Sequence, residues 1–265
     1  MTIGLSPEVQ LGPVALAWHG ILTAVALLVA LLVAERLATS RGLDPGPMAL
    51  VAAVAGIAGL VGARLFYLAQ EDPGRLLTPW SGGGTGFAFY GSLILGLPAT
   101  AAALHLMDRP VLAYLDLAAL AFPLAMAVGR VGDLINGEHY GPPTGLPWGV
   151  TYTNEASHAP EVGVAYHSGA LYEIVMVALL GAVLLAVHRR LRRPGDALWL
   201  VLGAYSLGRF VIFFWVRDVP VVGLGLRQAQ WTSLALIAVA IAGWWLGRRQ
   251  PGARAERSGE TPASA

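Results

Sequence analysis

The sequence predicts an all-α, polytopic membrane protein of seven transmembrane helices with a small extracytoplasmic head. Of the 265 residues, 56% are hydrophobic and only 12% are charged, whereas about a quarter of the residues in a soluble domain carry a charge. The mean hydropathy of +0.62 points in the same direction. Apolar runs long enough to cross the roughly 30 Å hydrocarbon core of a bilayer recur along the chain, which indicates the fold class.

The apolar runs give the expected helices in order. Alanine and glycine are frequent in them, as in Gly56–Ala63 (GIAGLVGA), and small residues let transmembrane helices approach closely. The fourth run is short, and its helix could extend into the polar segment that follows. We expect one transmembrane domain over residues 1–250 and a small, polar, disordered tail over 251–265. The expected spans are 14–38, 47–70, 86–107, 111–128, 169–188, 196–216 and 228–247.

The arginines predict the orientation of the chain. With the N-terminus outside, most arginines beyond the spans fall on the inner side, as the positive-inside rule requires. The C-terminus is then cytoplasmic, and the longest loop, about 129–168, forms the extracytoplasmic head. No Lys or Arg precedes Arg36, so the start lacks the basic region of a signal peptide and the first apolar segment is expected to be retained. The inner set is Arg36, Arg41, Arg109, Arg189, Arg190, Arg192, Arg193, Arg248, Arg249, Arg254 and Arg257.

Composition removes several classes of function. The chain has no cysteine, which excludes disulfides, thiolate metal sites and a cysteine nucleophile. A net charge of +1 gives no reason to expect a nucleic-acid partner. The six histidines form no HExxH or HxxxH pair, so we expect neither a metal site nor a cofactor.

Residues 129–141, GRVGDLINGEHYG, form the most informative segment. Charge where an apolar helix leaves the bilayer is costly and indicates a functional site. Given the expected topology, polar residues of six spans lie near one level in the outer half of the membrane, while the inner half is almost purely apolar. Arginine at this depth suits a phosphate, because its planar fork matches phosphate oxygens. The polar residues are His19, Arg64, Tyr90, Arg130, Asp133, Asn136, Glu138, His167, Tyr172, Glu173, Tyr205 and Arg209.

This layer predicts a phospholipid site, with the headgroup on arginines and the acyl chains in the apolar part. Arginine can neutralise a phosphate leaving group, while an acid, a histidine or a tyrosine accepts a proton from the nucleophile. Any thiol must come from the substrate, because the chain has no cysteine. A small-solute transporter is a second class, but it needs a polar path through the whole membrane, which the sequence does not offer.

Each of these residues also has a structural interpretation. Arg64 lies near a helix end and could extend to the interface, a single Tyr or His there is often an anchor, and Glu173 could pair with an arginine to hold two helices together. We expect Arg75, Arg217 and Arg227 to be solvated loop charges. Most tryptophans fit an aromatic belt at the interface; these are Trp18, Trp148, Trp199, Trp215 and Trp231.

The segment Gly129–Gly141 resembles the signature of prolipoprotein diacylglyceryl transferases, bacterial enzymes of seven transmembrane helices. Further blocks follow that family's order, and the resemblance covers roughly 10–247. It implies transfer of a diacylglyceryl group from phosphatidylglycerol to the lipobox cysteine thiol of a prolipoprotein signal peptide, with release of glycerol phosphate, in the bacterial cytoplasmic (inner) membrane. The blocks are LGPVALAWHG at the start, GARLFY at 62–67, GFAFYGSLIL from 86, HSGALYE at 167–173 and AYSLGRFVIFF from 204.

The resemblance also implies roles for individual residues. Arg130 and Arg209 would hold the phosphate and stabilise charge on it. Glu138 would help to shape the same site, and Tyr205 would support Arg209 or touch the lipid. The expected contacts of phosphatidylglycerol are Arg130, Arg64, Asp133, Asn136, Gly141 and Tyr205.

Four positions depart from the family pattern and leave the proton acceptor open. Tyr90 stands where many members have a histidine proposed as the base, and a tyrosine is a poor base at neutral pH. His19 stands for a tyrosine, Asp133 for an asparagine and Phe213 for a glutamate. We rank Glu138 and His19 above Tyr90, and the thiol could instead lose its proton to water. The departures also keep open a lipid-binding or lipid-moving protein of this fold without transferase chemistry.

Overall fold

A computed structural model describes residues 1–81, 86–215 and 221–249, and side chains up to 214 in the second of these ranges. The expected tail 251–265, Arg217 and the side chain of Trp215 therefore lie outside the described part. Within it, seven helices are long and apolar enough to cross a membrane, which confirms the mostly helical, seven-span prediction. They are α1 (Trp18–Ser40), α2 (Met48–Glu71), α3 (Phe89–Leu106), α4 (Val111–Asn136), α5 (Gly169–Val187), α6 (Asp196–Trp215) and α7 (Gln228–Arg249).

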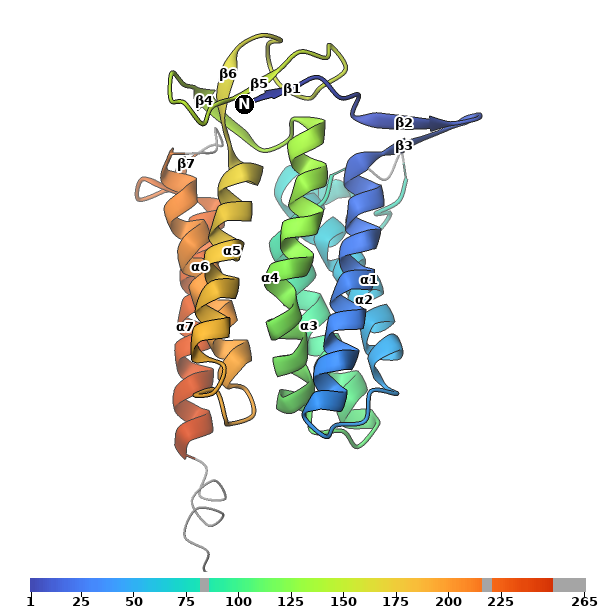
Figure 1. The fold of residues 1–265 in the computed structure, drawn as a ribbon, viewed down its shortest axis with the longest axis vertical. Helices are drawn as coiled ribbons and strands as arrows, with labels where there is room; N and C mark the ends of the chain where they lie inside the picture. The colour runs from blue at the N-terminus through green and yellow to red at the C-terminus, as the bar shows by residue number, and fades with distance from the viewer. Residues whose placement is uncertain (82–85, 216–220, 250–265) are drawn as a thin grey trace, which may run out of the picture.

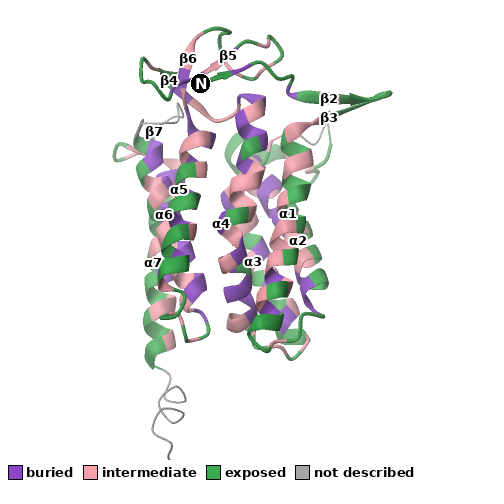
Figure 2. Cartoon of the chain, viewed as in Figure 1, coloured by how far each residue is buried: buried purple, intermediate pink, exposed green. Residues whose placement is uncertain are grey.

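The helices form two adjoining groups, α1–α4 and α5–α7 (Figure 1). Helix α4 connects them, because it packs on α1 in one group and on α5 and α6 in the other. In the first group, the backbones of α2 and α3 touch: a Cβ on Gly62 would lie 2.3 Å from the carbonyl oxygen of Gly91. Exposed positions occur along all the helices (Figure 2), and many of them are large apolar residues, as expected for surfaces in contact with lipid.

Two helix boundaries differ from the expected spans by four or more residues. Helix α1 begins at Trp18, because residues 14–17 belong to a strand. Helix α4 continues to Asn136 and ends at Gly137, which adopts the left-handed conformation with φ 79° that glycine tolerates best. The first half of the motif is therefore helical, and the head begins near residue 137 rather than 129. Arg130 and Asp133 consequently lie one turn apart on the same face of α4.

The head is built on a four-stranded sheet, which the sequence did not predict. Its strands lie in the order β1 (Thr2–Ile3), β5 (Val150–Tyr152), β6 (Ala165–Ser168) and β4 (Tyr140–Pro143). Strands β1 and β5 pair in parallel, and the other pairs are antiparallel. Tyr152 donates a 2.8 Å hydrogen bond to the Leu134 carbonyl of α4, and burial raises the pKa of its hydroxyl to about 12. The sheet therefore packs directly on the end of α4.

Two hairpins and a 3-10 turn complete the described chain. Strands β2 (Glu8–Leu11) and β3 (Val14–Ala17) form a hairpin that leads into α1, and β7 (Val221–Gly223) and β8 (Leu226–Arg227) form a second one before α7. A 3-10 turn at Pro73–Arg75 follows α2. The first hairpin projects sideways beside the head (Figure 1).

Hydrogen bonds to a carboxylate also connect the helices at the end of the bundle opposite the head. Asp116 of α4 accepts hydrogen bonds from the backbone N–H groups of Gly195 and Leu198, both at 2.8 Å. These donors belong to the start of α6, so a carboxylate from another helix caps them. Helix α4 is thus tied to the second helix group at this end as well.

Candidate functional site at the head end of the bundle

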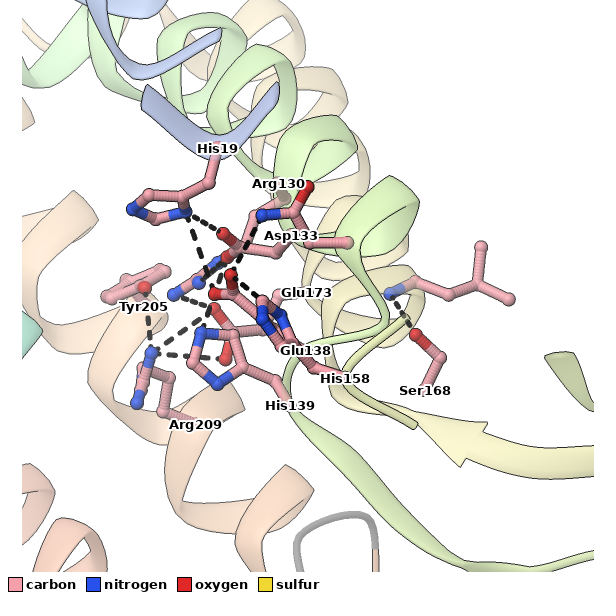
Figure 3. Close-up of polar contacts among 12 residues, drawn as sticks. His19, Arg130, Asp133, Glu138, His139, His158, Ser168, Glu173, Tyr205 and Arg209 are labelled. Carbon is pink, nitrogen blue, oxygen red and sulfur yellow. Dashed lines mark hydrogen bonds and ion pairs between the residues drawn. The ribbon is translucent and has the colours of Figure 1, made fainter. Parts of the chain in front are cut away.

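Two arginines from different helices meet at one buried carboxylate. Glu173 of α5 lies 2.7 Å from Arg130 Nη2 of α4 through its Oε2. Its Oε1 accepts a 3.1 Å hydrogen bond from Arg209 Nη1 of α6. Glu173 is fully buried, and both arginines are at most 7% exposed. The structure therefore brings Arg130 and Arg209 to the same place, as the level of these residues along their helices suggested (Figure 3).

A second carboxylate extends the cluster toward α1. Asp133 pairs with Arg130 through one oxygen and with His19 Nδ1 through the other. The close approach of α1 depends on Gly132, since a Cβ there would lie 2.9 Å from the Cα of His19. The result is one continuous line of contacts in which basic and acidic side chains alternate. It runs from His19 through Asp133, Arg130 and Glu173 to Arg209.

Histidines and a further acid surround the outer part of this line. Glu138 accepts a 3.0 Å hydrogen bond from the Asn136 amide, and its other oxygen lies 3.8 Å from His19 Nδ1. From the head, His139 Nε2 lies 3.4 Å from an Asp133 oxygen, and His158 Nδ1 lies 3.6 Å from Glu138. The side chains of His19 and His158 are about half exposed, so this rim is accessible while the arginines are buried.

The charges of the inner line balance. Arg130 and Arg209 are offset by Asp133 and Glu173, so the buried part is neutral overall. The Nε atoms of both arginines are buried and have no hydrogen-bond partner among the described residues. Such donors normally have partners in folded proteins. The two Nε–H groups can therefore donate hydrogen bonds to an anion that enters beside Glu173.

Aromatic rings enclose Arg209. Its guanidinium carbon lies 5.0 Å from the ring centres of Tyr90 and Phe213, 5.6 Å from that of Phe89 and 5.9 Å from that of Tyr205. Arg209 also donates a 3.4 Å hydrogen bond to the Tyr205 hydroxyl. Cation–π contacts of this kind stabilise a desolvated arginine and hold its fork in place.

The hydroxyl of Tyr90 contacts α7 rather than the arginine cluster. Its hydroxyl lies 2.5 Å from the Ser233 hydroxyl of α7, and the residue is 4% exposed. The structure thus places Tyr90 against Arg209 by its ring face and directs its oxygen to α7.

Other expected site residues lie around the cluster rather than in it. Arg64 is buried and donates to the carbonyl oxygens of Pro79 and Gly86, at 2.9 and 3.1 Å, so it supports the connection between α2 and α3. Gly141 is buried in β4. His167 Nδ1 contacts the Tyr172 hydroxyl at 2.9 Å. The assignment of Arg64 and Gly141 to the lipid stays a prediction.

One arrangement near the rim has the composition of a metal site. Ligand atoms of His19, Asp133 and Glu138 lie within 4.8 Å of one another. Asp133 is already paired with Arg130, whose positive charge opposes a cation at this position. The donor set therefore suits proton transfer better than metal binding.

Sequence reasoning underestimated three residues. Glu173 belongs to the predicted polar layer, but the sequence assigned it no catalytic or lipid-binding role, and its bridging of two arginines was not predicted. His139 lies within the singled-out segment 129–141 but was given no role, and the position of His158 in the sequence gave no sign that it approaches Glu138.

Comparison with known proteins agrees with this geometry. A sequence profile described as prolipoprotein diacylglyceryl transferase matches residues 8–246. Three relatives are named phosphatidylglycerol–prolipoprotein diacylglyceryl transferase. The protein of Symbiobacterium thermophilum is 32% identical over 91% of this chain and 92% of its own length. Those of Parasynechococcus marenigrum and Gloeobacter violaceus are each 34% identical over 91% of this chain, and over 93% and 92% of their own lengths. The chain therefore belongs to the prolipoprotein diacylglyceryl transferase family.

Proposed function

We propose that this multi-pass membrane protein transfers the diacylglyceryl group of phosphatidylglycerol to the lipobox cysteine thiol of a prolipoprotein. The product is a thioether, and glycerol phosphate leaves. One observation carries the proposal beyond the family relationship: Arg130 and Arg209, from two helices, converge on one buried anionic position at the head end. An embedded lipid would place its phosphate beside that carboxylate, against the Nε atoms of the two arginines, which have no hydrogen-bond partner among the described residues.

The arginines act on the leaving group. The cysteine sulfur attacks the glycerol carbon, the bond between that carbon and the phosphate oxygen breaks, and its electron pair goes to the phosphate. Negative charge grows on the phosphate as the bond breaks, and preorganised guanidinium groups in a dry site stabilise it. Glu173 holds both forks in place, and the Nε atoms supply further donors.

His19 is the proton acceptor that the geometry favours. Its Nδ1 faces Asp133, which fixes the ring and stabilises the imidazolium that forms, as the acid does in other histidine–carboxylate pairs. The side chain is 48% exposed, so a substrate thiol can reach it. Tyr90 is a poor alternative because its hydroxyl is buried against Ser233. Glu138, 3.8 Å from His19, adds negative charge beside the ring.

The four departures from the family pattern form two contacting pairs. His19 and Asp133 contact each other beside Arg130. Tyr90 and Phe213 both pack on Arg209. The polar pair therefore lies at the accessible rim and the aromatic pair in the buried part, which supports a transferase in which the proton acceptor has moved toward α1.

We place the protein in the bacterial cytoplasmic (inner) membrane with its head and site toward the outer leaflet. The arginine-rich connection between α5 and α6 lies at the opposite end of the bundle (Figure 1). The positive-inside rule favours the cytoplasm for that end. Substrate signal peptides would then meet the site from the extracytoplasmic side.

Purified protein incubated with phosphatidylglycerol and a lipobox peptide tests the proposal, with mass spectrometry of the peptide as the readout. We expect a mass gain of one diacylglyceryl group. Arg130→Ala and Arg209→Ala should abolish it, while Arg36→Ala, at the other end of the bundle, should not. Thermal unfolding of each variant shows that loss of product is not loss of fold. Binding of phosphatidylglycerol without peptide modification would instead support the lipid-binding alternative.

A further inference from the structure

A second cationic site lies at the end of the bundle opposite the head. A cavity of about 380 Å³ opens between the α5–α6 connection and the end of α7. Its volume is within the range of small-ligand sites, about 300–1,000 Å³. Five residues line it: Arg190, Arg192, Arg193, Asp196 and Arg248.

The arginines of this cavity have no carboxylate partner within 4 Å in the part of the chain that the structure describes. The one acid in the lining, Asp196, already accepts a 3.1 Å hydrogen bond from the Arg193 backbone N–H. The start of α6 beneath it is capped by Asp116. Among the described residues, the four arginine side chains of the lining therefore face a single carboxylate, that of Asp196, and the lining carries a net positive charge.

Aromatic residues place the cavity at the level of lipid headgroups. The guanidinium of Arg248 lies 4.8 Å from the ring of Trp244. The indole of Trp199 lies across Gly243, where a Cβ would be 2.5 Å from it, and close to Gly195. Tryptophans are enriched at membrane–water interfaces, so we expect the arginines beside them to lie at the depth of lipid phosphates.

We propose that this cavity binds the headgroup of an anionic phospholipid from the leaflet opposite the candidate active site. It lies about 20 Å from Arg209 along α6, at 1.5 Å of rise per residue, so one headgroup cannot occupy both sites. Basic pockets between helices bind anionic headgroups in this way. The bound lipid joins the α5–α6 connection to α7 by contacting arginines from both.

Native mass spectrometry of the full chain, titrated with phosphatidylglycerol in neutral detergent, tests this site. The variant Arg190→Gln/Arg248→Gln removes one cation from each side of the cavity. A matched control, Arg36→Gln/Arg41→Gln, makes the same change in charge at the same end of the bundle. Both variants alter side chains outside the catalytic cluster.

We expect wild type and control to bind one more lipid molecule than the cavity variant at intermediate concentration. A juxtamembrane arginine contributes about fivefold in affinity, so the double variant should bind the second lipid about 30-fold more weakly and Arg190→Gln alone about fivefold. Equal binding by wild type and the cavity variant, or an equal loss in the control, would overturn the proposal. Competition by millimolar inorganic phosphate would also contradict it, because the site would then select a free anion. The single variant preserves the test if the double variant unfolds.

Discussion

Replacing Glu173 by glutamine tests the central arrangement most directly. The substitution keeps the size of the side chain but removes one of the two carboxylate charges that offset Arg130 and Arg209, and only Asp133 remains. Breaking a buried ion pair by removing one partner costs roughly 3–5 kcal/mol, and we take about 3 kcal/mol because glutamine still accepts a hydrogen bond. At 2–4 °C per kcal/mol for a chain of this size, the melting temperature should fall by about 6–12 °C in lipid-free detergent.

The same variant should respond more strongly to its lipid. Without the Glu173 carboxylate, Asp133 still pairs with Arg130 but Arg209 loses its acidic partner. The phosphate of phosphatidylglycerol supplies the missing negative charge, so lipid should restore several degrees more in Glu173→Gln than in wild type. Saturating lipid at a hundred times its dissociation constant adds about 2.7 kcal/mol, which is comparable with the loss. Differential scanning fluorimetry with and without lipid measures both effects, and exposed Glu155→Gln serves as the control. A melting temperature within 2 °C of wild type, or an equal response to lipid, would refute the reasoning.

Three further predictions concern the rim and the head. His19→Gln should lower kcat about 10²–10⁴-fold while binding of phosphatidylglycerol persists, whereas Tyr90→Phe should keep kcat within a few-fold of wild type. Peptide turnover and lipid retention are the measurements for both variants, and equal losses of turnover would show that His19 is not the proton acceptor. Gly132→Ala should force α1 away from α4 and reduce turnover at least tenfold, unlike Gly20→Ala, whose added Cβ meets open space. Tyr152→Phe should lower stability by about 1–3 kcal/mol, since it leaves the Leu134 carbonyl buried without its donor; an unchanged unfolding midpoint would contradict this.

The transmembrane helices could be predicted because their determinant is local. An apolar run of suitable length fixes a helix across a bilayer irrespective of its neighbours, and each of the seven runs has its helix. The strands depend instead on partners far along the chain. Thr2 pairs with Thr151, and segments of two to four residues carry no period that reveals such pairing. The continuation of α4 past residue 128 was open for a related reason, because the stop at Gly137 lies beyond a polar stretch that resembles a loop.

The site was only partly predictable, because the position of a residue along its helix is local information but its direction around the helix is not. Counting residues along helices placed Arg130 and Arg209 at one level, but level alone does not give direction around each helix. Arg64 lies at a similar level, yet its hydrogen bonds run to the α2–α3 connection. The bridge through Glu173 and the approach of His139 depend on how α5 and the head are rotated against α4, which tertiary packing decides.

Helix α4 makes polar contacts with the second helix group near each of its ends. These contacts restrict how a lipid with two acyl chains can enter the bundle. Asp116 holds the first turn of α6, and Arg130 holds Glu173 of α5. A clamshell motion that swung the two helix groups apart would break hydrogen bonds to carboxylates, each worth about 1.5–3 kcal/mol. We therefore expect the acyl chains to enter laterally between helices whose backbones keep their positions. Only side chains would then move to admit the lipid.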